Sequence, residues 1–389
     1  MKRRIICLFL AVSCLFMSGC SSIYKNYREI EQLQVIQTLG LDYDDGIFTL
    51  TIASGKPLDN SKPLILTVQA PSITTGLEQL QDLVAAEELF FSHTRSIIIG
   101  QSMAENCAPS VLDYVCRAPT MRHNIDFYVI KDGDAEDLIR GAGDGCYDIT
   151  EELSSLKRDI ELRGQGIVYS CGDIATDMSR QGSALACAIS IVDTDDAFTS
   201  GGGGLSAAHT GFAILKNGGL AGFIDRPESC GACILMGKGA LGAIVINAAG
   251  SRLTLLPSGS SASMEPVWNA DGTLDRIDVS CSIFAAVSDM TPPIDIADSG
   301  VISEMGSALS RDVESWLTGA IQASQDMEAD FLGIGGLLQR SDPDNFAAME
   351  ENWPHALADI RFSVRAECDV ERTFDLKKPA NGGDGSDAS

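Results

Sequence analysis

Cysteine is the residue type in this sequence with the clearest chemical role, and Cys20 is the clearest case. It follows residues 15–19, a stretch that ends in the small residues Ser18 and Gly19. Small side chains suit the peptidase that cuts lipoprotein precursors, and a thiol at the new N-terminus can carry a diacylglycerol through a thioether bond. We therefore expect cleavage after residues 1–19 and lipidation of the Cys20 sulfur by palmitate-type chains. Two acyl chains are enough for stable anchoring to a membrane.

The residues before Cys20 have the layout of a bacterial signal peptide. Lys2, Arg3 and Arg4 form a basic start, and residues 5–17 are almost wholly apolar and uncharged. At about 13 residues and roughly 1.5 Å per residue, this run is too short to span a bilayer core of about 30 Å. An ordinary signal peptide with a chance cysteine is the alternative. The apolar run, the small pair and the cysteine nevertheless occur in the order that lipidation requires.

The other residues capable of chemistry show weaker patterns. Cys230 and Cys233 form a C-x-x-C pair, a spacing found in redox disulfides and in half of a zinc site. No second C-x-x-C or histidine pair accompanies it, so we expect buried structural thiols. The histidines are scattered without metal-ligand spacing, and we predict no metal, no cofactor and no catalytic residues. The histidines are His93, His123, His209 and His355.

Two further groups have both a functional and a structural interpretation. Ser92 and His93 are neighbours, but adjacent residues of a strand point to opposite faces, so we do not expect a catalytic dyad. Arg95, Arg117 and Arg122 stand out because basic residues are scarce in this chain. They could bind carboxylates of a partner or form salt bridges within the protein, and we favour the salt bridges.

The composition limits the size and the partners of the folded body. The precursor has 389 residues, 45% of them hydrophobic, and a net charge of -26 at pH 7. Removing the signal peptide leaves about 370 residues, enough for two or three domains. Such acidity excludes nucleic acid, because phosphate binding needs clustered Lys and Arg. Anionic lipid headgroups would also repel this surface, and no later run is long and apolar enough for a membrane span.

Alternating apolar residues and turn signals predict most of the strands. A hairpin is expected over 33–43 and 47–53 around an aspartate–glycine turn, and a second over 210–216 and 220–225 around an asparagine–glycine turn. Residues 358–370 alternate strictly between apolar and charged side chains, which predicts a half-buried antiparallel strand. Further strands are predicted at 96–100, 125–131, 184–192, 243–247, 252–256 and 277–287.

Apolar residues at helical spacing predict the helices. Pro109 is expected to begin or break one of them, and the face of another around Trp316 is expected to pack in the core. Residues 200–204 are a glycine run that we interpret as a linker, since it lacks the Gly-Lys-Ser/Thr ending of a phosphate loop. Helices are predicted at 77–89, 111–117, 135–140, 149–161, 227–236 and 301–331.

Four sequence blocks in series behind the Cys20 pattern resemble one protein family. In this order they resemble the Ger(x)C family, the C subunits of bacterial spore germinant receptors. The likeness covers nearly the whole chain after the signal peptide. The blocks are 27–33 with 40–42, then 91–100 with 112–122, then 211–225 with Glu228, and finally Gln322, 330–335 and Trp353.

The resemblance implies an α+β protein of three domains, with mixed and antiparallel sheets, packed helices, a long C-terminal helix and a final strand. It implies a body tethered to the outer face of the spore inner membrane. It also implies assembly with two integral-membrane subunits into a receptor for small-molecule nutrients. The domains expected are a signal peptide at 1–19, a lipidated tether at 20–32, an N-terminal α+β region of one or two subdomains at 33–200, a C-terminal α+β domain at 201–376 and a disordered tail at 377–389.

These inferences leave more than one function open. The first hypothesis is a lipid-anchored, non-enzymatic C subunit that acts in germination through contacts with the two membrane subunits. The alternative is a substrate-binding surface lipoprotein that captures the small-molecule germinant itself. A surface hydrolase is the least favoured, because the sequence has no G-x-S-x-G elbow, H-E-x-x-H helix or nucleotide loop.

Overall fold

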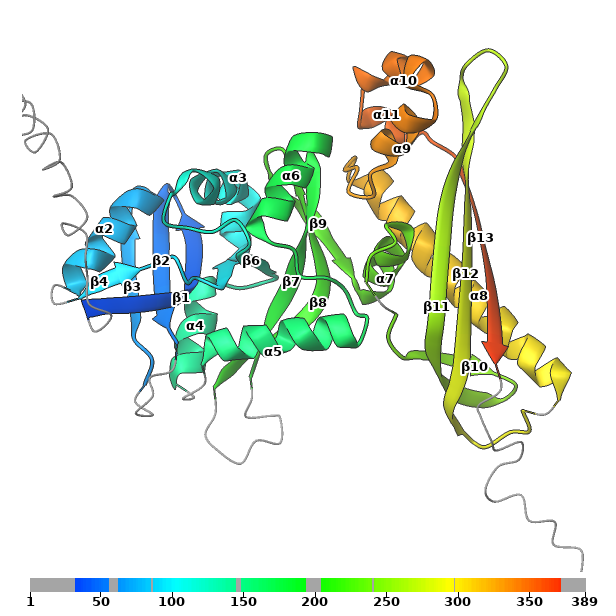
Figure 1. The fold of residues 1–389 in the computed structure, drawn as a ribbon, viewed down its shortest axis with the longest axis horizontal. Helices are drawn as coiled ribbons and strands as arrows, with labels where there is room; N and C mark the ends of the chain where they lie inside the picture. The colour runs from blue at the N-terminus through cyan, green and yellow to red at the C-terminus, as the bar shows by residue number, and fades with distance from the viewer. Residues whose placement is uncertain are drawn as a thin grey trace, which may run out of the picture.

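The computed structural model describes most of the chain after the tether (Figure 1). The signal peptide, Cys20, the tether to residue 31, residues 200–203 and the predicted tail lie outside the described residues. The described residues are 32–55, 62–84, 87–144, 148–193, 204–239, 241–296 and 298–371.

Within the described residues, the N-terminal part is built on a nine-stranded mixed sheet, on the left of Figure 1. The strand order is β3-β2-β1-β5-β6-β7-β8-β9, and the short β4 pairs with β1. Strands β1, β4, β5, β6 and β7 are parallel, and antiparallel hairpins complete both edges. The strands are β1 (Leu33–Asp44), β2 (Ile47–Ser54), β3 (Ile65–Ala70), β4 (Glu88–Phe90), β5 (Ser96–Ile99), β6 (Asp126–Ile130), β7 (Ser183–Asp193), β8 (Leu205–Lys216) and β9 (Gly219–Asp225).

Helices cover both faces of this sheet, which is why its central strands are apolar throughout. In β5, Ile97 and Ile99 pack with α2, α3 and α6, whereas Ile98 packs on the opposite face with α4 and α5. All three isoleucines are fully buried. The helices are α2 (Ile73–Leu83), α3 (Gln101–Arg117), α4 (Ala135–Asp144), α5 (Ile149–Leu162) and α6 (Cys171–Gln181).

Both predicted hairpins are present, but several details of the N-terminal prediction were wrong. Asp45 and Gly46 both have positive φ, as the predicted tight turn requires. The helix expected at 77–89 begins and ends earlier, and Leu89 belongs to β4 because it pairs with β1. Helix α6 was not predicted. Pro109 lies inside α3 instead of at a break.

The position of Pro109 has a structural consequence for α3. Proline has no N–H, so the carbonyl of Glu105, four residues earlier, loses its helical partner. That carbonyl faces Gly219 at the start of β9, where a Cβ atom would collide with it. The exposed polar turn of α3 therefore lies against the hairpin edge of the sheet, and glycine leaves room for it.

The C-terminal part contains a second, four-stranded sheet in the order β10-β11-β12-β13, within the residues described. Helix α8 packs along one face, as Figure 1 shows, and the other face is open. The strands are β10 (Ile244–Ala248), β11 (Ser251–Trp268), β12 (Leu274–Thr291) and β13 (Phe362–Glu371). The helices are α7 (Arg226–Leu235), α8 (Ser299–Asp326), α9 (Ile334–Ser341), α10 (Pro343–Glu350) and α11 (His355–Ala358).

The final strand has the predicted burial pattern but not the predicted direction. Ala366, Cys368 and Val370 are buried, and the charged residues between them are exposed. However, β13 pairs with β12 in parallel, so the antiparallel prediction was wrong. The physical reason is α8, which carries the chain back along the sheet and makes β12–α8–β13 a crossover unit. The one-sided burial arises because α8 covers a single face.

Strands β11 and β12 are much longer than predicted. Beyond Leu256, β11 is rich in serine, and its apolar alternation fades. Hydroxyl pairs continue the ladder on the open face, with 2.8 Å between Ser261 Oγ and Ser282 Oγ and 2.9 Å between Ser263 Oγ and Ser280 Oγ. Because small polar residues do not produce an apolar alternation, the sequence pattern does not predict this part of the strand.

The fold class predicted from the sequence is confirmed: the protein is α+β with mixed sheets, packed helices, a long C-terminal helix and a final strand. The hydrogen-bonded large sheet runs past residue 201, because β8 and β9 complete it. We retain the division at 200 and 201 as a proposal about domains. Across the described part of the chain, no helix is long and apolar enough to cross a membrane.

Candidate functional site

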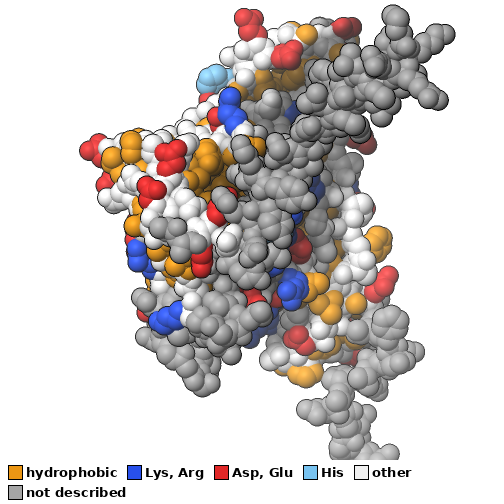
Figure 2. Space-filling model, turned by 60° about the vertical axis from the view of Figure 1, so that its left-hand side comes forward, with side chains coloured by type: hydrophobic (Ala, Val, Ile, Leu, Met, Phe, Trp, Pro, Cys, Tyr) orange, Lys and Arg blue, Asp and Glu red, His pale blue; other side chains and the backbone are white. Residues whose placement is uncertain are grey.

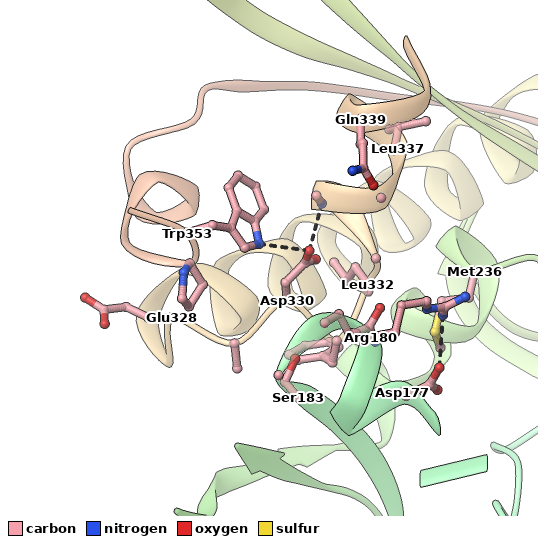
Figure 3. A pocket seen from close by; sticks show the side chains of 18 of the residues that line it. Asp177, Arg180, Ser183, Met236, Glu328, Asp330, Leu332, Leu337, Gln339 and Trp353 are labelled. Carbon is pink, nitrogen blue, oxygen red and sulfur yellow. Dashed lines mark hydrogen bonds and ion pairs between the residues drawn. The ribbon is translucent and has the colours of Figure 1, made fainter. Parts of the chain in front are cut away.

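The candidate site is a cleft of about 610 Å³ between the two parts of the protein (Figure 3). One wall comes from the end of α6, the start of β7 and the end of α7. The other comes from the segment 328–333, α9, α10 and Trp353. A volume of this size falls in the range of pockets that take small molecules.

The C-terminal wall is organised by the buried carboxyl group of Asp330, which is 1% exposed. It accepts hydrogen bonds from the backbone N–H groups of Ile334 and Gly335 at 2.7 Å each, at the start of α9. The indole Nε1 of Trp353 donates a third at 3.2 Å, which Figure 3 also shows. Burial raises the pKa of Asp330 to about 6 despite these donors. Asp330 thus fixes the start of α9 and ties it to Trp353.

A charged network joins the two parts at the edge of the cleft. Lys216, from the β8–β9 hairpin, lies 3.7 Å from the carboxylate of Glu328 and donates at 3.1 Å to the carbonyl of Met327. Glu328 also lies 2.7 Å from Nδ1 of His355 on α11. These side chains are partly exposed, so the network positions the two walls more than it stabilises the fold.

The N-terminal wall combines an ion pair with a buried hydroxyl. Arg180 pairs with Asp177 of the same helix at 2.9 Å. Gly182 ends α6 in the left-handed conformation with φ 72°, and this turns the chain into β7. Ser183, the next residue, is 1% exposed and lines the cleft, and its Oγ has no hydrogen-bond partner within the described structure.

Helix α7 lies behind the cleft and connects β9 of the large sheet to β10 of the second sheet. Gly231 lies so close to the backbone of Trp316 in α8 that a Cβ atom would collide with its carbonyl oxygen. Glycine is therefore required at position 231 on this face of α7. Burial raises the pKa of Cys230, and raises that of Cys233 to about 12, so both thiols stay protonated. Cys233 is buried, as the structural interpretation of this pair expects, whereas Cys230 is partly exposed.

The other predicted candidates do not form one site. Ser92 Oγ donates to the carbonyl of Thr120, and the ring of His93 contacts Phe90, so the two side chains do not face each other. Arg117 forms an exposed salt bridge with Asp113 one turn earlier in α3, which is the internal salt bridge that we favoured.

The remaining predicted residues lie apart from the cleft or beyond the described chain. Arg95 and Arg122 are exposed on loops. His209 is buried, and burial lowers its pKa to about 4. Among the described residues, no group of His, Cys, Asp and Glu could hold a metal ion. Cys20 lies outside the described residues, so its lipidation stays a prediction.

Sequence reasoning missed the role of two aspartates that lie in the recognised blocks. Like Asp330, Asp42 is buried and caps a helix: it accepts from the backbone N–H groups of Ala135 and Glu136 in α4 at 2.7 and 2.9 Å. Burial raises its pKa to about 6 as well. The sequence signal available was an aspartate close to a glycine in each block. The helix that Asp42 caps, however, lies 93 residues further along the chain.

Comparisons with known proteins agree with this architecture. Residues 26–191 match the spore germination protein N-terminal domain, and residues 210–374 match the spore germination B3/GerAC-like C-terminal domain. Spore germination protein KC of Bacillus subtilis (strain 168) is 21% identical over 410 residues, covering 96% of each chain. The crystal structure of the GerBC protein has the same fold, with a TM-score of 0.56 at 14% identity over 85% of this chain and 96% of that one. The chain therefore belongs to the Ger(x)C family of spore germination proteins, as its four sequence blocks predicted.

Proposed function

We propose that this protein is a lipid-anchored, non-enzymatic C subunit of a spore nutrient germinant receptor. The observation that carries the proposal is the match of two germination domains in series, which together span residues 26–191 and 210–374. The signal peptide and Cys20 pattern ahead of them supports attachment by lipid. The same family membership supports two integral-membrane subunits as partners and the outer face of the spore inner membrane as the location.

The structure suits a role as a scaffold for other proteins. Its two parts are joined by α7, which packs on β8 and β9 as well as on α8, and by the Lys216–Glu328 contact, so they offer surfaces held in a fixed relation. Figure 2 shows acidic side chains spread over the visible face instead of gathered in one patch. A surface of this kind favours solubility and discriminates among partners more than it binds them tightly.

The anchoring part of the proposal is tested by replacing the acylated sulfur. The expected result for Cys20→Ala is loss of lipidation and release of the protein from washed spore membranes into the soluble fraction. Cys116→Ala is the matched control, since its thiol is exposed on α3 and belongs to a different segment of the sequence from Cys20. Full membrane retention of the Cys20→Ala protein without an acyl group would contradict anchoring by lipid.

The partner part is tested separately by affinity isolation of the tagged protein from detergent-solubilised spore membranes. Two integral-membrane proteins are expected in near-equal amounts with it. Isolation of the lipidated protein alone, under conditions that keep other membrane complexes intact, would contradict the assembly. The two experiments fail independently, because a lipoprotein can be anchored without belonging to a receptor.

The cleft favours a second candidate function, capture of a small molecule by the lipoprotein itself. Its volume of about 610 Å³ and its mixture of apolar and charged walls suit a small ligand. A ligand that raises the melting temperature of the purified protein would support this function, and the receptor-subunit proposal does not depend on it.

A further inference from the structure

We infer that the cleft between the two parts binds a small organic carboxylate, with the carboxylate held at its mouth by Arg340 and Lys238. The inference concerns this chain alone and does not rest on lipid anchoring or on the membrane subunits. It is carried by the charges that line the cleft, by a buried hydroxyl without a partner and by the apolar part of the walls.

The acidic groups of the cleft are already matched. Asp177 pairs with Arg180, Glu328 with Lys216 and His355, and Asp330 with the backbone of α9 and Trp353. Glu350, exposed at the rim, is the exception among the described residues. Little negative charge is therefore left to attract a cationic ligand.

Two basic groups of the cleft are not matched by a carboxylate in the described structure. Lys238, just after α7, lines the cleft and has no ion pair with a described residue, and its ammonium group lies 4.9 Å from the centre of the Tyr169 ring. Arg340, near the end of α9, lies on the opposite wall and has no ion pair with a described residue. On a chain with a net charge of -26, two unmatched cations facing one cleft favour an anionic ligand.

The deeper part of the cleft offers one polar group and a set of apolar ones. The Oγ of Ser183 is buried and has no hydrogen-bond partner in the described structure. A buried polar atom without a partner costs free energy, and a polar atom of a ligand could remove that cost by forming a hydrogen bond with it. Leu332, Leu337 and Met236 also line the cleft. An inorganic anion would leave these apolar side chains without a contact, so the geometry favours a carboxylate on an apolar body.

The start of α9 is not the anion site. Its first N–H groups already bind the carboxyl group of Asp330, at 2.7 Å to Ile334 and 2.7 Å to Gly335. A ligand carboxylate must therefore bind near the other end of α9, where Arg340 lies. Because Arg340 and Lys238 lie on opposite walls of the cleft, such a ligand would contact both walls at once.

The test uses the purified full chain, as expressing cells process it, and isothermal titration calorimetry, with buffer alone as the blank. The probes are phenylacetate, its neutral counterpart phenylacetamide and inorganic phosphate. We expect phenylacetate to bind about tenfold more tightly than phenylacetamide or phosphate. The loss of one charge-assisted contact raises the dissociation constant by about tenfold. Arg340→Gln and Lys238→Gln should each weaken phenylacetate binding about tenfold.

The control is Arg311→Gln, which removes an exposed arginine of α8 outside the cleft and should change the dissociation constant less than about twofold. Circular dichroism checks that each variant folds. If one of the two cleft variants does not fold, the other still tests the inference, because their residues lie on different walls. Equal binding of phenylacetate and phenylacetamide, no binding of phenylacetate at millimolar concentration, or equal effects of all three variants would overturn the inference. If phosphate binds as tightly as phenylacetate, the conclusion that the ligand has an apolar organic body is wrong.

Discussion

Replacing Asp330 with asparagine should change how the stability of the protein depends on pH. The asparagine side chain keeps the size of the original and one accepting oxygen, but it cannot ionise. The wild-type carboxyl group is buried, and its pKa rises from 3.8 to about 6. The folded state therefore holds a proton on Asp330 over a pH range in which the unfolded state has released it.

The sign and the size of the effect follow from this difference. A group whose pKa is raised by folding contributes its stability fully below the unfolded pKa, and that contribution is lost as the pH rises through the folded value. The window is about pH 4 to 6. Two pKa units at about 1.4 kcal/mol each give a loss of about 3 kcal/mol for Asp330 across the window. The asparagine variant should not show this loss.

The assay is urea unfolding followed by tryptophan fluorescence at several values between pH 4 and pH 7.5, with the wild type and Asp330→Asn side by side. Subtracting the two curves removes the contributions of all other titrating groups. The free-energy cost of the substitution should be greatest at pH 4 and should shrink by about 3 kcal/mol by pH 7.5. A cost that grows with pH would refute the reasoning. It would mean that the three N–H donors stabilise the carboxylate by more than burial destabilises it.

Two further predictions concern packing and thiol reactivity. Gly231→Ala should destabilise the protein by about 2 kcal/mol, since its Cβ would collide with the carbonyl of Trp316, whereas Gly218→Ala, in open space, should change the melting temperature little. Equal melting temperatures for the two variants would contradict the packing of α7 on α8. Iodoacetamide should modify the exposed Cys116 of the native protein well before the buried Cys187, whose pKa burial raises. Mass spectrometry of early samples checks the order, and prior loss of the Cys187 thiol would contradict the described burial.

Local patterns predicted the elements whose burial is one-sided and whose turns have strong sequence preferences. The first hairpin follows from its Asp-Gly turn, in which Asp45 and Gly46 both adopt positive φ. The alternation of β13 from Phe362 to Glu371 gave its buried face correctly. In each case the signal lies within the segment itself.

Other features depend on partners far away in the sequence. The direction of β13 is set by the path of α8 and not by its own residues, so alternation could not show that it is parallel. Pro109 lies inside α3, and the Glu105 carbonyl that it frees lies against Gly219 of β9, a neighbour far away in the sequence. The cleft joins residues such as Ser183 and Asp330, which are far apart in the chain, and no local pattern predicts such a meeting.

Mass spectrometry of the N-terminal peptide from native spore membranes tests the central claim most directly. A receptor subunit held by lipid should yield a peptide that begins at Cys20 and carries a diacylglyceryl group on its sulfur. A peptide that retains residues 1–19, with an unmodified Cys20, would contradict the account.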